Sequence, residues 1–209
     1  MKPPASTTIL GIETSCDETA AAVLDGEGHV LANVISSQQT VHERFGGVVP
    51  ELASRAHIQN VDHVTRQALD AAGLTWQDLG AIAVTQGPGL AGALLVGISY
   101  AKSLAYALGI PLVGVSHLEG HIASAWIDRP SFPRTCVVLI ASGGHTHLFH
   151  ATEHGGFHLM GRTIDDAAGE AFDKGAQMLG LGYPGGPLID AAARKGSPAA
   201  VRFPRSRVR

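Results

Sequence analysis

A pattern of three short apolar runs followed by a helix occurs twice in this chain, and this doubling constrains the fold more than any other feature. The strand-like runs are residues 8–12, 20–24, 29–35, 135–141, 145–150 and 157–163. A helical stretch follows each set of three, first at residues 50–72 and then at 165–179. Strands and helices in this order favour a mixed α/β sheet in each half. The repeat lies in the pattern and not in residue identity, and it predicts two lobes, residues 8–128 and 134–209.

The stretch between the two copies adds further elements to the first lobe. We expect strands at residues 81–85 and 111–115 and helices at 89–108 and 116–127. The helix at 89–108 is apolar on nearly all sides, which is typical of a helix packed between other elements. The uncharged segment that contains its first half is interrupted by Gln86-Gly87-Pro88-Gly89. A strand and a helix therefore explain this segment better than a membrane span.

The composition indicates a globular protein of the cell interior. Of the 209 residues, 45% are apolar, which is enough for a packed core. The net charge of −3 excludes a dominant nucleic-acid-binding footprint at the level of the whole chain. Cys16 and Cys136 make no disulfide framework, and the N-terminus lacks the apolar segment of a signal peptide. We therefore expect a reducing, cytoplasmic setting without a membrane.

Two histidines four residues apart form the clearest candidate for metal binding. His117 and His121 share a helix face, which suits a divalent metal, although two surface histidines show the same spacing. Ser116 and Glu119 form an S-x-x-E capping box, which predicts that the helix begins at this site. In the zinc-protease pattern H-E-x-x-H the Glu directly follows the first His. Glu119 comes one position later, so a capping role explains it better.

A catalytic metal typically has three ligands from the protein, so a third would have to come from elsewhere. His145 and His147 alternate along a predicted strand and therefore share one of its faces. They could supply the third ligand, but ordinary side chains on a half-exposed strand are the better explanation.

A polar turn follows the first strand of each copy, at residues 13–19 and 142–146. Gly143 and Gly144 let backbone amides approach a phosphate or carboxylate, although most such turns are plain hairpins. Two such turns facing each other across a cleft would clamp a phosphate. Asp17 and Glu18 would repel it unless a metal or a proton intervenes. We expect Cys16 to be a small buried residue rather than a nucleophile, because nothing nearby is basic enough to lower its pKa.

Two later segments are candidates for nucleoside binding or for packing alone. Asp166, Glu170 and Asp173 would lie on one face of the helix at 165–179. Their carboxylates would either accept hydrogen bonds from sugar hydroxyls or form a solvated face. Residues 182–190 combine two prolines with glycines, which predicts a rigid loop that opens into a helix at 187–195. The backbone amides at that point could bind a ligand, and a loop used only for packing would look similar.

Seven short segments carry the most specific signal when they are taken in order. They are ILGIETSCDET, GGVVPELASRAH, TQGPGLAGALLVG, HLEGH, ASGGHTHL, DDAAGEAFDK and YPGGPLID. In this order they closely resemble the TsaD family, the tRNA adenosine threonylcarbamoyltransferases formerly called O-sialoglycoprotein endopeptidases. The resemblance runs from about Ile9 to Arg205 and implies an α/β, actin-like (ASKHA), two-lobed ATPase fold. Family members continue to a late Asn contact and a late Asp metal ligand. We therefore expect an incomplete second lobe here, through a frameshift or premature stop after Arg205.

The resemblance also implies an activity. A threonylcarbamoyl group would pass from threonylcarbamoyl-adenylate, made by a separate enzyme, to N6 of the adenosine 3′-adjacent to the anticodon (position 37) in ANN-decoding tRNAs, and AMP would leave. One bound Fe²⁺ or Zn²⁺ would position the donor and polarise its carbonyl. The implied partners are tRNA, a paralogous scaffold subunit and a small ATPase.

Carried over motif by motif, the resemblance assigns roles to residues of this chain. His117 and His121 would be the metal ligands, and Asp17 and Glu18 would act near the reacting groups. The threonylcarbamoyl-phosphate part of the donor would be held by Ile140, Ala141, Ser142, Gly143 and Gly144. Its adenosine part would be held by Asp173, Gly186 and Asp190.

Three other interpretations of the protein's function are also consistent with the sequence. A non-catalytic scaffold of the same modification complex would not need both His117 and His121 or the turn at Ser142. A metallo-glycoprotease is disfavoured by the position of Glu119. An inactive truncated fragment would follow from the absence of the third metal ligand.

Overall fold

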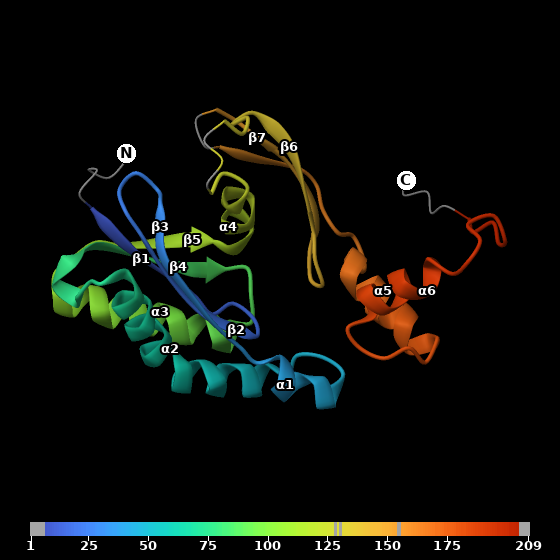
Figure 1. Ribbon diagram of the computed structural model, residues 1–209, viewed down its shortest axis with the longest axis horizontal. Helices are drawn as coiled ribbons and strands as arrows, with labels where there is room; N and C mark the ends of the chain where they lie inside the picture. The colour runs from blue at the N-terminus through green and yellow to red at the C-terminus, as the bar shows by residue number, and fades with distance from the viewer. Residues whose placement is uncertain (1–6, 128, 130, 154–155, 205–209) are drawn as a thin grey trace. The chain divides into compact units, whose positions relative to one another are not determined.

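The computed structural model describes residues 7–127, 129, 131–153 and 156–204 (Figure 1). The chain divides into two compact units. The first comprises Met1–Val138 and Ala151–Phe157, and the second comprises Leu139–His150 and His158–Arg209. The lobe limits expected from the sequence, 8–128 and 134–209, stay a prediction.

A five-stranded mixed sheet with the order β3-β2-β1-β4-β5 organises the first unit. Its strands are β1 (Thr8–Glu13), β2 (Glu18–Leu24), β3 (Val30–Ser37), β4 (Leu79–Gly87) and β5 (Leu112–Ser116). The first three form the expected antiparallel meander, whereas β4 and β5 run parallel to β1. Leu10 of the central strand lies opposite Val23 on one side and Ile82 on the other, and all three are fully buried. The apolar alternation of these strands therefore builds the core of the unit.

Two long helices pack against this sheet, as Figure 1 shows. Helix α2 (Pro50–Ala72) contacts β2 and β3, and α3 (Ala91–Leu108) contacts β4 and also α2. Pro50 starts α2 because a proline is tolerated in the first turn, and Gly73 ends it with a φ of 69°. Three short helices were not expected, because runs of three or four residues carry no periodic signal. They are α1 (Gln39–His42), η1 (Glu43–Phe45) and η2 (Trp76–Asp78).

The expectation that the helix at 89–108 is packed on all sides is wrong. Helix α3 buries one stripe of small residues, Ala93, Gly97, Ala101 and Ala105, which follow one another at a spacing of four. Of its larger side chains, Leu95 and Tyr106 are 63% and 90% exposed. Others pack against the core but are only partly buried, namely Val96, Ile98, Tyr100, Leu104 and Leu108. Within the described part of the chain, α3 alone is long and apolar enough to cross a membrane by length and composition. Here its small-residue stripe is used to approach a protein sheet.

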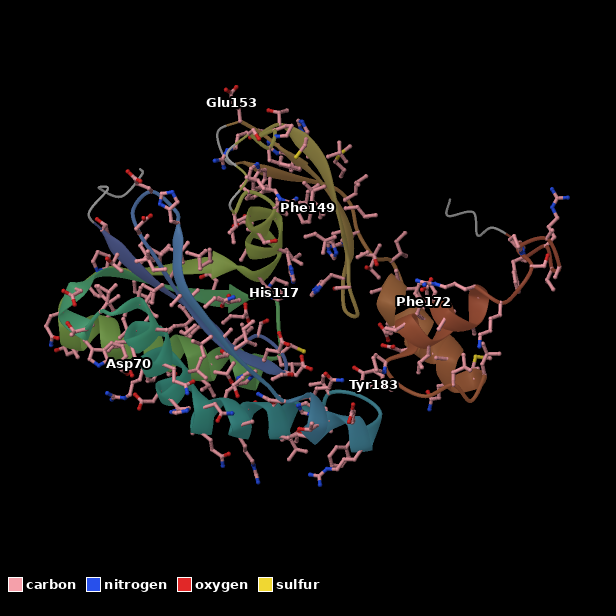
Figure 2. All side chains as sticks on the ribbon, viewed as in Figure 1. Asp70, His117, Phe149, Glu153, Phe172 and Tyr183 are labelled. Carbon is pink, nitrogen blue, oxygen red and sulfur yellow. The ribbon has the colours of Figure 1, made fainter. Side chains whose placement is uncertain are left out.

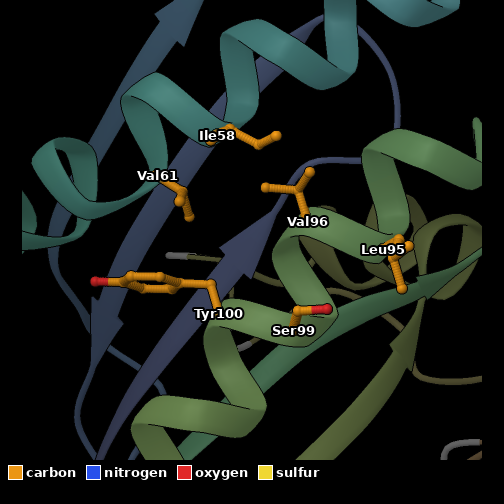
Figure 3. Close-up of a pocket in the computed structure, with 6 residues that line it drawn as sticks. All are labelled: Ile58, Val61, Leu95, Val96, Ser99 and Tyr100. Carbon is orange, nitrogen blue, oxygen red and sulfur yellow. The ribbon is translucent and has the colours of Figure 1, made fainter.

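An open apolar groove lies between the two long helices of the first unit (Figure 3). Its lining residues are Ile58, Val61, Leu95, Val96, Ser99 and Tyr100. The hydroxyl of Tyr100 donates to Asp62 Oδ1 at 3.0 Å and lies 2.9 Å from the hydroxyl of Thr65. These hydrogen bonds connect α2 and α3 at one side of the groove.

Helix α4 (His117–Ser124) begins directly where β5 ends. The hydroxyl of Ser116 accepts a long hydrogen bond, 3.5 Å, from the backbone N–H of Glu119. This is the serine half of the predicted capping box.

The remaining strands, β6 (Cys136–Ala141), β7 (Thr146–Ala151) and β8 (Phe157–Gly161), form a three-stranded sheet in that order. Two helices of the second unit pack on each other, α5 (Ala168–Met178) and α6 (Gly185–Ala193). The prediction that a helix begins at residue 165 is wrong. Ala167 is extended, and Thr146 Oγ1 accepts from the N–H of Ala168 at 2.8 Å, so a side chain from β7 caps the helix start. Asp166 therefore precedes the helix and does not share its face.

Candidate metal centre and substrate-binding turns

His117 and His121 occupy successive turns of α4, and their rings are nearly perpendicular, with an interplanar angle of 83° (His117 is labelled in Figure 2). Their Nε2 atoms lie 3.1 Å apart. Two metal–nitrogen bonds of about 2.0–2.1 Å that meet at about 95–110° place their nitrogens roughly 3.0–3.4 Å apart. The pair therefore fits a shared ion, and the same distance accommodates a hydrogen bond when one Nε2 carries a proton.

The electrostatic setting keeps His121 suited to metal binding. Burial lowers the pKa of His121, and the neighbouring His117 lowers it further. A neutral imidazole is the form that ligates a metal. The ring of His121 thus favours the state that a metal requires.

A carboxylate lies on the other side of His117. Glu13 ends β1, and its Oε2 is 3.2 Å from His117 Nδ1. Thr85 of β4 donates its hydroxyl to the same Oε2 at 2.6 Å, and the backbone N–H of Ser15 donates to Oε1. Burial raises the pKa of Glu13, but the hydrogen bonds from His117, Ser15 and Thr85 outweigh this effect and hold the pKa at about 2. Glu13 is therefore a carboxylate at neutral pH.

The topology of the sheet explains why these residues meet. Because β1, β4 and β5 are parallel, their carboxyl ends lie at one edge of the sheet. Glu13, Thr85 and Ser116 stand at or near those ends, and His117 follows Ser116. This edge is where open α/β sheets commonly bind ligands. Sequence reasoning missed Glu13, although its position at the end of a buried strand was a usable signal.

The turn that carries Asp17 and Glu18 is firmly held within the first unit. Thr14 donates its hydroxyl to the carbonyl of Ala93 at 2.9 Å, and the carbonyl of Asp17 accepts from the N–H of Gln38 at 3.0 Å. Glu18 is exposed and Asp17 is half-buried on the same turn as Ser15. Both carboxylates thus lie on a fixed segment that begins at the carboxyl edge of β1.

For Cys16, the expected burial is wrong, whereas the expected lack of nucleophilic character agrees with the structure. Cys16 is exposed rather than buried. Loss of solvation around its thiol and the adjacent Asp17 raise its pKa to about 12. The expected lack of nucleophilic character therefore agrees with a thiol that stays protonated at neutral pH.

In the second unit, the turn Ser142-Gly143-Gly144 closes the β6–β7 hairpin. The N–H of Ser142 donates to the carbonyl of His145 at 2.8 Å, and the carbonyl of Ser142 accepts from Gly169 at the start of α5. A Cβ at Gly169 would lie 2.6 Å from that carbonyl oxygen, so glycine permits this close approach. Ile140 is buried, whereas Ala141, Gly143 and Gly144 are exposed and leave their backbone accessible.

The predicted adenosine-binding residues come together on α5 and α6. Asp173 Oδ1 accepts from the N–H of Gly185 at 2.7 Å and so holds the start of α6. Gly186 follows, with open space where a Cβ would stand, and Asp190 lies one helical turn later. Asp190 pairs with Arg194 at 2.8 Å. Asp173 thus already has a structural partner on one of its two oxygens.

Two other acidic groups have local explanations. Asp166 and Glu170 both pair with Lys174, at 2.6 and 3.1 Å, which agrees with a solvated charged surface. Asp25, Glu27 and His29 bring three ligand-type atoms within 4.8 Å of one another in the β2–β3 turn. However, Asp25 Oδ1 accepts three backbone N–H groups and its Oδ2 lies 2.8 Å from His29 Nδ1, so this carboxylate closes the hairpin.

The histidines considered as a third ligand lie in the second unit. The predicted strand at residues 145–150 begins one residue later, so His147 lies in β7 whereas His145 directly precedes it, and their ring centroids are 5.3 Å apart. His147 stacks on Phe149, with an interplanar angle of 13°. These contacts show the three rings packed against one another at the start of β7.

Comparisons with known proteins agree with the motifs. A family model described as "TsaD: tRNA N6-adenosine threonylcarbamoyltransferase" matches residues 29–209. Proteins named tRNA N6-adenosine threonylcarbamoyltransferase from Clostridium perfringens and Moorella thermoacetica are 56% and 57% identical to this chain over 198 and 200 residues. The matches cover 95% and 96% of this chain and 58% of each relative. The chain thus spans less than two thirds of the length of the curated relatives it matches.

Solved structures support the fold class. YeaZ from Pseudomonas aeruginosa is 24% identical with a TM-score of 0.52, and the match covers 75% of this chain and 66% of YeaZ. The ethanolamine utilization protein EutJ from Carboxydothermus hydrogenoformans is 17% identical with a TM-score of 0.51, and the match covers 91% and 61% of the two chains. These likenesses confirm the expected actin-like α/β fold.

Proposed function

The chain belongs to the TsaD family of tRNA N6-adenosine threonylcarbamoyltransferases, and from this premise we propose that it takes part in that transfer. The threonylcarbamoyl group of threonylcarbamoyl-adenylate passes to N6 of the adenosine 3′-adjacent to the anticodon in ANN-decoding tRNAs, and AMP is released. The observation that carries this proposal is the His117–His121 pair at the carboxyl edge of the parallel strands, with its two Nε2 atoms 3.1 Å apart.

These histidines fit a divalent ion by their donor type and by the separation of their nitrogens. Fe²⁺ or Zn²⁺ bound there would supply Lewis-acid polarisation of the donor's carbonyl. The chain's own residues do the binding and orientation. The exposed backbone of Gly143 and Gly144 takes the threonylcarbamoyl-phosphate part of the donor.

The remaining roles follow from position and charge. Asp173, Gly186 and Asp190 bind the adenosine part, for which Gly186 leaves open space and the carboxylates offer acceptors to ribose hydroxyls. Asp17 and Glu18 stand on the fixed turn after β1 and accept the proton that the attacking amine releases. The leaving AMP takes the electron pair of the broken carbonyl–phosphate bond.

Partners and setting belong to the same proposal. The net charge of −3 agrees with a chain that shares tRNA binding with other proteins rather than gripping tRNA alone. We place a YeaZ-like paralogous scaffold and a small ATPase in that complex, and we place the complex in the cytoplasm.

The test is transfer by the purified chain with its partners, tRNA and synthetic threonylcarbamoyl-adenylate, measured as modified adenosine by mass spectrometry. Replacing both His117 and His121 by alanine should abolish the transfer. The matched control, His63→Ala, removes an exposed histidine of α2 and should leave it unchanged. Equal transfer by the double variant would favour a scaffold. No transfer by the unaltered chain would favour an inactive fragment.

A further inference from the structure

Each nitrogen of the His117 ring faces a different group. Nε2 lies 3.1 Å from His121 Nε2, whereas Nδ1 lies 3.2 Å from Glu13 Oε2. His121 is one helical turn away from His117, whereas Glu13 is 104 residues away in the sequence. The ring therefore connects the end of the central strand to the helix face that would hold a metal.

The chemistry of these contacts assigns the proton on the His117 ring. Both oxygens of Glu13 accept hydrogen bonds, Oε1 from the backbone N–H of Ser15 and Oε2 from the hydroxyl of Thr85, so the side chain acts as an acceptor toward His117 as well. His117 Nδ1 must therefore carry the hydrogen and donate it to Oε2. The hydroxyl of Ser15, 3.1 Å from the same Nδ1, can donate to Glu13 or share the Nδ1 hydrogen. In the neutral ring this leaves the lone pair on Nε2, the atom that faces His121.

The carboxylate is itself fixed before any ligand arrives. Thr85 is 7% exposed and belongs to β4, the strand next to β1, and its hydroxyl holds Oε2 at 2.6 Å. The backbone N–H of Ser15 holds Oε1. Glu13 thus has one orientation, and through Nδ1 it gives the His117 ring one orientation as well.

We propose that Glu13 is a positioning residue of the metal centre, which fixes the tautomer and the ring orientation of His117 and thereby raises the affinity for a divalent cation. The inference rests on the proposed metal site at His117 and His121. A carboxylate behind a ligating histidine strengthens metal binding, because it orients the ring and makes its free nitrogen more basic.

The experiment measures the binding of Co²⁺ and Zn²⁺ to the full 209-residue chain by competition with a chelator, together with the visible spectrum of the Co²⁺ form. Glu13→Gln should weaken binding by about 10- to 100-fold and change the Co²⁺ spectrum. The matched control is Glu119→Gln, which removes the same charge from an exposed position on α4, between the two histidines. It should leave affinity and spectrum unchanged.

The outcomes separate this inference from the proposed function. If His117→Ala binds the metals as well as the unaltered chain, the metal site itself is wrong. If His117→Ala loses binding but Glu13→Gln keeps full affinity, the metal site stands and the role of Glu13 is overturned. A merely structural Glu13 would lower the unfolding temperature of the metal-free chain and leave the affinity unaltered.

A second variant covers the case in which Glu13→Gln does not fold. Thr85→Val keeps the shape of the side chain and removes the hydroxyl that holds Glu13 Oε2. It should weaken Co²⁺ binding by several-fold in a folded chain. Unchanged affinity in this variant would count against a role for the orientation of Glu13.

Discussion

At the scale of single residues, His57 is the clearest case of a polar group that the fold has fully enclosed and satisfied. Its ring is 0% exposed. Nε2–H donates to the carbonyl of Cys16 at 2.9 Å, and Nδ1 lies 2.8 Å from the hydroxyl of Thr19. Cys16 and Thr19 both belong to the segment from β1 to β2. His57 of α2 therefore holds the turn that carries Asp17 and Glu18 in place. The segment GGVVPELASRAH therefore has a role beyond the start of a helix.

This burial predicts how stability depends on pH. Loss of solvation lowers the pKa of His57 below 6.5, and His42 lowers it further, while the contact with Cys16 and the charges of Glu13 and Asp17 act in the opposite direction. In the unfolded chain the ring takes up a proton near pH 6.5, whereas in the folded chain it stays neutral to lower pH. The stabilisation is therefore complete above pH 6.5 and is lost progressively below it.

The measurement is the free energy of unfolding by urea at pH 7.5 and 5.5. The unaltered chain should lose stability on acidification, by at most about 1.4 kcal/mol per pH unit from this group. The loss should shrink in His57→Gln. His63→Gln, an exposed change on the same helix, serves as the control. An equal loss in the unaltered chain and in His57→Gln would contradict the assignment.

At the scale of elements, helix α3 and the β1–β2 turn approach each other closely because glycine stands at the contact. A Cβ at Gly97 would collide with Thr14 Oγ1, and one at Gly89 would lie 2.6 Å from the carbonyl oxygen of Ser15. The same contact carries the hydrogen bonds from Thr14 to Ala93 and from Leu90 to Ser15. The motif TQGPGLAGALLVG thus sets how near α3 lies to the turn after β1.

Gly97→Ala should therefore destabilise the chain by about 1–3 kcal/mol, because Thr14 must move away and lose its bond to Ala93. Alanine is otherwise the better helix former, by roughly 1 kcal/mol. Gly120→Ala in α4, where a Cβ meets nothing within 4 Å, is the control for that preference. Chemical denaturation measures both variants. If Gly97→Ala gains stability as the control does, α3 does not pack as closely as described.

At the scale of the whole molecule, the buried core is unevenly distributed. The main hydrophobic cluster lies in the sheet and long helices of the first unit, with Leu10, Val23 and Ile82 at its centre. In α5 and α6 of the second unit, Ala176 and Gly185 are the buried residues. Larger side chains there are open to solvent, such as Phe172, labelled in Figure 2, and Met178, which is 88% exposed.

Backbone amides of α5 and α6 should accordingly exchange with deuterium at least about tenfold faster than those of β1 and β4, since protection follows burial and local contact density. Exchange of the 209-residue chain followed by mass spectrometry of peptides tests this. Uniform protection across both units would show that they unfold together.

Most of the helices and strands follow from local signals in the sequence. Alternating apolar residues predicted the strands around Leu10 and Val23, and Pro50 and Gly73 marked the ends of α2. These signals are local, because pleat, helical period and backbone restrictions act within a few residues. The same is true of the spacing of His117 and His121, which follows from one turn of helix.

Contacts between residues far apart in the sequence depend on how the whole chain folds. The strand order β3-β2-β1-β4-β5 brings Glu13 and Thr85 to His117, and the cap of α5 comes from Thr146 on another element. The open outer face of α3 was equally invisible, since an apolar sequence does not reveal which sides a neighbour covers. Several strand pairings can satisfy the local sequence signals equally well. The observed pairing is the one in which the whole sheet and its covering helices bury their apolar faces together.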